Sequence, residues 1–210
     1  MVEERVKDAI EPRRRAGRLA SSGVIREAAA TLFLERGYQG TSMDDVAAAA
    51  QVSKQTIYTH FASKEELFAD LVLGNADRVE EFIKRIAEIM AARGSLETRL
   101  RRLAREYLGF VVRPDVLRLR RLIIGEAARF PDLAGRYYEL VPARVYAALT
   151  SEFGRLGLRD PALAAQQFAW LTVGLPLDRG MFHPVETAAE GADLDHLAAS
   201  AAHVFVAAYG

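Results

Sequence analysis

Hydrogen-bonding and cationic side chains gather between residues 53 and 64, in a stretch without acidic residues. No Asp or Glu occurs from Val46 to Lys64, a window that holds three basic side chains: Lys54, His60 and Lys64. The same window supplies amides and hydroxyls from Gln55, Thr56, Tyr58 and Thr59. Short hydrogen-bonding side chains near the start of a helix can reach base edges, and cations and hydroxyls around them can hold phosphates. The combination favours nucleic-acid binding, although each residue alone also fits a solvated helix face.

Three serines mark where the helices that carry these side chains should begin. Ser42, Ser53 and Ser63 each precede a helical pattern and are predicted N-caps. A turn at Gln51-Val52 joins the second and third of the helices in this region. That pair therefore has the proportions of a helix-turn-helix.

Apolar side chains at helical spacing supply a core for this head. Over residues 22–36 the apolar stripe consists of Ile25, Ala28, Ala29, Leu32 and Phe33. Gly37 is a predicted left-handed terminator of that helix. In the helix after Ser53, Ile57 and Phe61 are expected to point inward, which leaves the polar side chains outside.

Residues 22–68 resemble the DNA-binding head of the TetR family of bacterial transcriptional regulators. The resemblance rests on Phe33, Gly37-Tyr38, Thr41-Ser42, Val46-Ala47, Val52-Ser53, Thr56-Ile57-Tyr58, His60-Phe61 and Ser63-Lys64-Glu65. In that family the heads bind DNA as a dimer. The resemblance implies base or phosphate contacts by Lys54, Gln55, Thr56 and Thr59. It further implies phosphate contacts by Tyr58, His60 and Lys64, and by Thr41 and Ser42 at the start of the second helix.

The chain departs from many relatives at two positions where they have glycine. Gln51 stands in the turn, where a left-handed non-glycine residue costs about 1–2 kcal/mol, so the turn is expected to be strained or differently shaped. Gln55 stands near the start of the third helix, where a long amide could reach a base directly.

The remainder of the chain reads as further helices without an alternating strand pattern. The expected ranges are 64–92, 96–112, 116–130, 133–156 with a kink or late start at Pro142, 161–175 and 194–209. We therefore predict an all-α fold, with a helix-turn-helix head over residues 21–66 and a larger helical body over 67–210. Residues 1–20 would form a basic arm, either a solvated tail or an extension that reaches the phosphate backbone or a minor groove.

The body is similar to the AefR-like branch of the same family over Arg118–Tyr138. This resemblance implies a ligand cavity, whose candidate residues are Tyr107, Phe110, Leu122, Glu126, Phe130, Tyr138, Gln166, Trp170 and Phe182. The alternatives are that the aromatic residues form plain core, that Glu126 pairs with an arginine, and that Trp170 lies at a dimer seam. The expected ligand is a small apolar or aromatic molecule, and Glu126 would favour a cationic or hydrogen-donating group on it.

A homodimer is expected through the last two long helices. Their apolar faces comprise Leu163, Phe168, Leu171 and Val173 on the first helix, and Leu197, Ala201, Val204 and Phe205 on the second. The resulting prediction is a regulator of double-stranded operator DNA, acting as a repressor that a ligand releases.

Composition excludes several other classes of protein. The 210 residues include 28 basic and 28 acidic side chains and no cysteine, which rules out disulfides and thiolate metal sites. The charged N-terminus shows no secretory signal, and no apolar tract is long enough for a bilayer, so we expect a cytoplasmic protein. There is no nucleophile elbow, phosphate-binding glycine loop or zinc-binding His-Glu-x-x-His, so neither an enzyme nor a cofactor is expected. His196 and His203 share a helical face but lack a third ligand, which leaves no predicted metal site.

Overall fold

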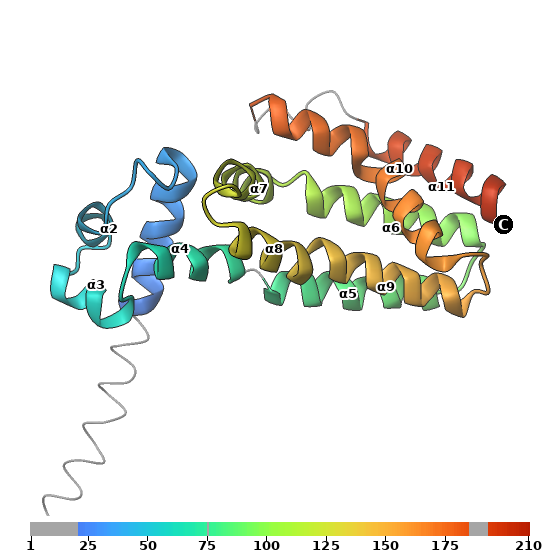
Figure 1. The fold of residues 1–210 in the computed structure, drawn as a ribbon. Coiled ribbons are helices and arrows are strands. Elements are labelled where there is room, and N and C mark those ends of the chain that lie inside the picture. The colour runs from blue at the N-terminus through green and yellow to red at the C-terminus, as the bar shows by residue number, and fades with distance from the viewer. Residues whose placement is uncertain (1–20, 75, 185–192) are drawn as a thin grey trace, which may run out of the picture. The chain divides into compact units, whose positions relative to one another are not determined.

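The computed structural model describes residues 21–74, 76–184 and 193–210 (Figure 1). Within these ranges every regular element is a helix, which confirms the predicted all-α fold. The chain divides into two compact units, Met1–Val72 and Leu73–Gly210, a division later than the one expected after residue 66. The predicted basic arm over residues 1–20 lies outside the described ranges.

The head consists of a helix over residues 21–36, α2 (Met43–Ala49), α3 (Lys54–His60) and α4 (Lys64–Leu73). The predicted starts after Ser42 and Ser53 are confirmed, because each serine hydroxyl accepts a hydrogen bond from the backbone three residues later. The third serine behaves similarly, since Glu66 N donates to Ser63 Oγ over 3.2 Å.

Three aromatic rings form the centre of the head. The ring centroids of Phe33 and Phe68 lie 5.4 Å apart, and those of Tyr38 and Phe68 lie 5.0 Å apart. Ile57 and Phe61 are buried as predicted, with exposed fractions of 0% and 4%. This core fixes α3 by its apolar face and turns its polar face outward.

The body contains α5 (Ala76–Ala91), α6 (Leu96–Val111), α7 (Pro114–Glu126), α8 (Pro131–Leu140), α9 (Pro142–Arg155), α10 (Pro161–Phe182) and α11 (Leu194–Tyr209). Helix α6 packs against α5 and α11, and α9 packs against α5 and α10 (Figure 1). Phe153, Phe168 and Phe205 meet in the middle of this bundle with ring centroids 5.2–5.7 Å apart. They are fully or almost fully buried, so the body has its own hydrophobic core.

Several predicted helix boundaries were wrong. The helix expected over residues 64–92 is two helices, because α4 ends at Leu73 and α5 begins at Ala76. The apolar pattern continues across this break, but Gly74 there is a poor helix former. The helix expected over 116–130 begins earlier, at Pro114, and ends at Glu126.

Two prolines of the body show how context decides their effect on a helix. The helix expected over residues 133–156, with a kink or late start at Pro142, is two helices, since α8 ends at Leu140 and α9 begins with Pro142. In contrast, α10 continues through Pro176 to Phe182, although the sequence predicted an end near Leu175. Pro176 is buried, so packing offsets the missing backbone hydrogen bond.

Candidate nucleic-acid interface

Helix α3 presents a polar surface opposite its buried face. Lys54, Gln55, Tyr58 and Thr59 are exposed, whereas Thr56 and His60 are half-buried at the edges of this surface. No acidic residue lies in the first turn, and Ser53 Oγ accepts from Thr56 N over 3.0 Å. The structure thus brings the predicted α3 residues onto one short, capped helix.

The hydroxyls on α3 already have partners within the helix. Thr59 Oγ1 donates to the backbone oxygen of Gln55 over 2.8 Å, and Thr56 Oγ1 lies 2.8 Å from Ser53 Oγ. These bonds hold each hydroxyl in place while its oxygen can still accept a further bond. The amide of Gln55 reaches farthest from the backbone among the uncharged side chains at the start of α3.

The turn before α3 is left-handed at a non-glycine residue. Gln51 has φ 55°, a region that favours glycine, so of the two expected outcomes the turn shows the strained one. Its N–H donates to Ala48 O over 3.2 Å, and the next N–H, of Val52, donates to Ala47 O over 3.0 Å. These two bonds form a Schellman motif that ends α2 and directs the chain into α3.

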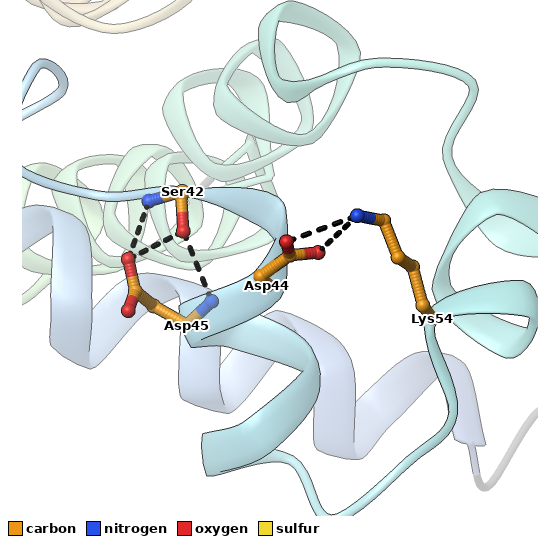
Figure 2. Close-up of polar contacts among 4 residues, drawn as sticks. All are labelled: Ser42, Asp44, Asp45 and Lys54. Atoms are coloured by element: carbon orange, nitrogen blue, oxygen red, sulfur yellow. Dashed lines mark hydrogen bonds and ion pairs between the residues drawn. The ribbon is translucent and has the colours of Figure 1, made fainter.

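Lys54 is held by an acidic partner that the sequence analysis missed. Its Nζ lies 2.8 Å from Asp44 Oδ1 and 2.9 Å from Asp44 Oδ2 (Figure 2). The hydrogen bond to Asp44 raises the pKa of Lys54. Both side chains are more than 60% exposed, so this ion pair contributes little stability and can be exchanged for another anion. The two acids in the first turn of α2 were the available signal for this pair.

The start of α2 carries a complete capping box. Asp45 N donates to Ser42 Oγ over 3.1 Å, while the carboxylate of Asp45 accepts from Ser42 N over 2.9 Å (Figure 2). The side-chain hydrogen bond from Ser42, and then its backbone hydrogen bond, lower the pKa of Asp45. Ser42 is exposed here and remains a candidate contact.

Thr41 does not occupy the surface position expected of a phosphate contact. Its side chain is 2% exposed, and Oγ1 donates to Gly37 O over 3.0 Å. The hydroxyl therefore closes the turn after the first helix instead of facing outward. Sequence spacing could not show this, because the turn folds Thr41 back onto the head.

Lys64 has an internal role that its position in the sequence did not reveal. Its Nζ donates to Tyr38 O over 2.9 Å and to Thr41 O over 2.8 Å, and it lies 4.1 Å from the centroid of the Tyr38 ring. Tyr38 in turn donates to Glu65 Oε1 over 2.6 Å. Lys64 thus connects the start of α4 to the loop before α2.

The predicted ligand residues of the body divide into two groups. Tyr107 is buried and four others are half-buried: Phe110, Leu122, Glu126 and Phe130. The remaining four lie on the surface of the described chain, which corrects their assignment to an enclosed cavity: Tyr138, Gln166, Trp170 and Phe182. Tyr138 is 51% exposed and its neighbour Tyr137 only 7%, because the rotation of α8 turns Tyr137 inward.

The predicted dimer faces also needed correction. Four of their residues are buried in the core of their own chain: Phe168, Val173, Ala201 and Phe205. Three are exposed: Leu163 at 43%, Leu171 at 46% and Val204 at 49%. Trp170, Leu175 and Phe182 add to the exposed apolar side chains of α10.

The described residues contain no group of three His, Cys, Asp or Glu side chains that could hold a metal ion. His203 Nδ1 lies 3.3 Å from Glu97 Oε1, which gives this histidine a partner on another helix. No helix within the described ranges is long and apolar enough to cross a membrane.

Comparisons with known proteins match both units. A sequence profile of "Bacterial regulatory proteins, tetR family" matches residues 25–71, and one of the "AefR-like transcriptional repressor, C-terminal domain" matches residues 98–210. A TetR-family transcriptional regulator from Mesorhizobium loti MAFF303099 is 33% identical with a TM-score of 0.80, over 92% of this chain and 98% of that one. The flavonoid-responsive regulator FrrA is 31% identical with a TM-score of 0.65, over 90% of this chain and 97% of that one.

The curated relatives match over shorter parts of their length. The transcriptional activator FasR of Mycolicibacterium smegmatis is 27% identical over 153 residues, which is 73% of this chain and 66% of FasR. In a second relative the matched segment covers only 25% of that protein.

Proposed function

Because the chain belongs to the TetR family of bacterial transcriptional regulators, we propose that it is a homodimeric repressor that binds operator DNA through α3 and is released by a small ligand. The observation that carries the DNA-binding part is the surface of α3, where amide, hydroxyl and basic side chains are exposed on a capped helix without acidic residues. Such a helix fits the major groove of B-DNA. The site of action is the cytoplasm, where the DNA is.

Within α3 we assign base reading to Gln55 and backbone contact to Lys54. Gln55 is exposed one position after the first residue of the helix, and a glutamine amide can pair with adenine through two hydrogen bonds. Lys54 would exchange Asp44 for a phosphate, since the exposed ion pair costs little to break. Ser42, Thr56, Tyr58, Thr59 and His60 complete the proposed contact surface, and Lys64 and Thr41 support it from within the head.

Selection of bound sequences from a random duplex library tests these assignments. Gln55→Ala should relax the preference at one position of each half-site, at a cost of about 1–3 kcal/mol there. Lys54→Met should weaken binding to all sequences alike and reduce the salt slope by about one. Gln166→Ala, an exposed glutamine on α10, is the matched control and should change neither. An unchanged ranking of sequences with Gln55→Ala would remove its role as a base reader.

Repression is the proposed sign of regulation because the body matches the profile of an AefR-like repressor over residues 98–210. Activation is the second candidate, since FasR is an activator and is similar over 73% of this chain. A reporter placed behind the selected operator decides between them. Reporter output should fall when the protein is supplied, and a rise would assign activation instead.

The proposed effector is a small apolar or aromatic molecule bound in the body, near Tyr107, Phe110, Leu122, Glu126 and Phe130. The similarity to FrrA, a flavonoid-responsive regulator 31% identical to this chain, supports an aromatic effector. Such a ligand releases DNA only if its affinity is higher for the conformation that cannot bind DNA than for the conformation that can. Operator DNA must then weaken ligand binding by the same factor, which paired titrations can measure.

A further inference from the structure

Four polar side chains from four consecutive helices come together inside the body. Tyr107 lies on α6, Arg120 on α7, Tyr137 on α8 and Tyr146 on α9, and each of these helices packs against the next. Tyr107 and Tyr137 are only 6% and 7% exposed, and the other two side chains are half-buried. We refer to these four residues as the tyrosine–arginine cluster.

The charge of Arg120 acts on all three tyrosines, so the members of this cluster lie near one another. Burial raises the pKa of all three phenols, and the positive charge of Arg120 acts on each of them in the opposite direction. Tyr146 further raises the pKa of Tyr107, which places these two phenols close together. One guanidinium therefore lies within electrostatic range of three phenols from separate helices.

The polar atoms of the cluster have no partners within the described part of the chain. There, the hydroxyls of Tyr107, Tyr137 and Tyr146 form no hydrogen bond, and Arg120 forms no ion pair. Buried polar groups are nearly always hydrogen-bonded, and an orphaned one costs about 1–3 kcal/mol. Among the described residues, the fully enclosed side-chain nitrogens and oxygens that lack a partner comprise only Arg99 Nε, and none of the three phenol oxygens. The phenol oxygens are therefore not fully enclosed, and water or another molecule can reach them.

Neighbouring carboxylates do not compensate the charge of Arg120. Glu106, next to Tyr107 in the sequence, pairs with Arg85 over 3.4 Å. Asp115, on the same helix as Arg120, accepts from Arg78 over 2.6 Å and from Arg113 over 3.0 Å. These two acids are occupied by other arginines, so they leave the guanidinium of Arg120 able to bind an added anion.

An aromatic wall stands beside the cluster. The rings of Phe82 and Phe110 stack with their centroids 4.7 Å apart, and the ring of Phe82 lies 5.4 Å from that of Tyr107. The site therefore combines an apolar wall with a cation and three hydroxyl donors. Such a combination suits an amphipathic molecule.

We propose that the effector of this protein is an amphipathic anion, whose acidic oxygens bind Arg120 and the three phenol hydroxyls while its apolar part packs against Phe82 and Phe110. An arginine stays charged and offers a planar fork of donors that matches a carboxylate. The inference rests on the proposed ligand regulation and narrows its chemistry. It replaces the cationic group that Glu126 alone suggested, since the cluster combines a positive charge with two buried phenols.

Two fluorescent probes that share one aromatic scaffold test the proposal on the full chain. Anilinonaphthalene sulfonate carries an anion, and N-phenyl-1-naphthylamine is its neutral counterpart. Arg120→Gln should weaken binding of the sulfonate by about 10-fold or more, the equivalent of one charge-assisted contact of 1.4 kcal/mol, and leave the neutral probe within about 2-fold. Arg136→Gln, an exposed arginine on α8, is the matched control and should change neither.

A second variant separates recognition from folding. Tyr107→Phe keeps the buried ring, removes one donor and should weaken the sulfonate by about 2- to 10-fold, with the neutral probe unchanged. Equal sulfonate affinity in Arg120→Gln, Tyr107→Phe and the parent chain would overturn the proposal and place the probe on an exposed apolar surface. Equal losses for both probes would also overturn it, because they would show a role in structure.

Operator binding by the ligand-free variants distinguishes this inference from the proposed function. If operator DNA binds normally while Arg120→Gln leaves the affinity for the sulfonate unchanged, the anion inference fails and the DNA-binding assignment stands. If no DNA binds while Arg120→Gln weakens the sulfonate and not the neutral probe, the proposed regulation fails and the anion site stands.

Discussion

Gln51 holds a conformation that favours glycine, and this single residue connects the two helices of the DNA-binding motif. Its φ of 55° allows both Schellman hydrogen bonds at the end of α2. The side chain is exposed, so no packing interaction offsets the steric cost of the left-handed backbone. The strain is local and can be relieved without a change in the turn.

Gln51→Gly should therefore stabilise the protein. Glycine removes a strain of about 1–2 kcal/mol. Its greater conformational freedom in the unfolded chain costs about 0.5–1 kcal/mol of that stability, so we expect the free energy of unfolding to rise by roughly 0.5–1 kcal/mol. Urea denaturation measures the free energy of unfolding of the head. Gln55→Gly, inside α3, is the matched control and should destabilise. A loss of stability with Gln51→Gly would show that the glutamine makes a compensating contact.

Lys64 illustrates how a residue that looks like a phosphate ligand can instead organise the site. Its ammonium group donates to two backbone oxygens, at Tyr38 and Thr41, and lies against the Tyr38 ring. These contacts hold the loop that leads into Ser42 and the start of α2. A change at Lys64 should therefore affect folding before it affects DNA.

Lys64→Met should lower the free energy of unfolding by about 1.5–3 kcal/mol, the range for hydrogen bonds to a charged group. Lys84→Met, at an exposed position on α5, should change it by less than about 0.5 kcal/mol. Chemical denaturation of both variants gives the comparison. If Lys64→Met kept full stability and only weakened DNA binding, its main role would be phosphate contact.

At the scale of elements, α7 and α10 approach each other where Gly180 meets Leu117. A Cβ atom added to Gly180 would lie 2.7 Å from Leu117 Cδ2 and 2.9 Å from its Cδ1. Arg121 reinforces this contact, since its Nε donates to Gly180 O over 2.8 Å and its Nη2 donates to His183 O. The packing fixes α7, the helix that carries Arg120 of the cluster.

Gly180→Ala should destabilise the body by about 1–3 kcal/mol, because the added methyl group overpacks a close contact. Gly125→Ala on α7 is the matched control, since a Cβ there meets nothing within 4 Å. That change should be neutral or stabilising by up to about 1 kcal/mol, through helix propensity alone. The unfolding temperature should fall for Gly180→Ala and stay constant or rise for Gly125→Ala, and equal shifts in the two variants would contradict the assigned packing.

At the scale of the whole molecule, α10 exposes large apolar side chains that the described part of the chain leaves uncovered. Its large exposed side chains are Leu163, Trp170, Leu171, Leu175 and Phe182. Several recur at spacings of four and seven residues, which puts them on one side of the helix. An apolar stripe of this kind marks an interface and agrees with the proposed homodimer.

Leu175→Glu should convert the proposed dimer into a monomer, because it places a charge in the apolar stripe where the side chain is 64% exposed. Operator affinity should fall with it, since two joined heads are needed to meet half-sites about 34–36 Å apart. Sedimentation velocity at micromolar concentration measures the oligomeric state. Ile124→Glu, on α7 and 59% exposed, should leave it unchanged. A Leu175→Glu chain that still sediments as a dimer would exclude this stripe as the interface.

The sequence alone determined the features that depend on short-range interactions. Serine caps, proline positions and apolar spacing act within one or two helical turns, so the starts of α2, α3, α10 and α11 followed from neighbouring residues. The left-handed backbone of Gln51 agrees with one of the two outcomes expected for this turn, a strained one. The family and its mode of DNA binding rest on the same local motifs.

Tertiary structure decided which side chains remained available for chemistry. Lys64 meets Tyr38 and Thr41 across 26 and 23 residues, and this contact gives it a structural role. The rotation of α8 buries Tyr137 and leaves Tyr138 exposed, and the packing of four helices brings Arg120 near Tyr107, Tyr137 and Tyr146. The spacing of residues along a chain does not predict such long-range contacts, because they depend on how whole helices pack and rotate against one another.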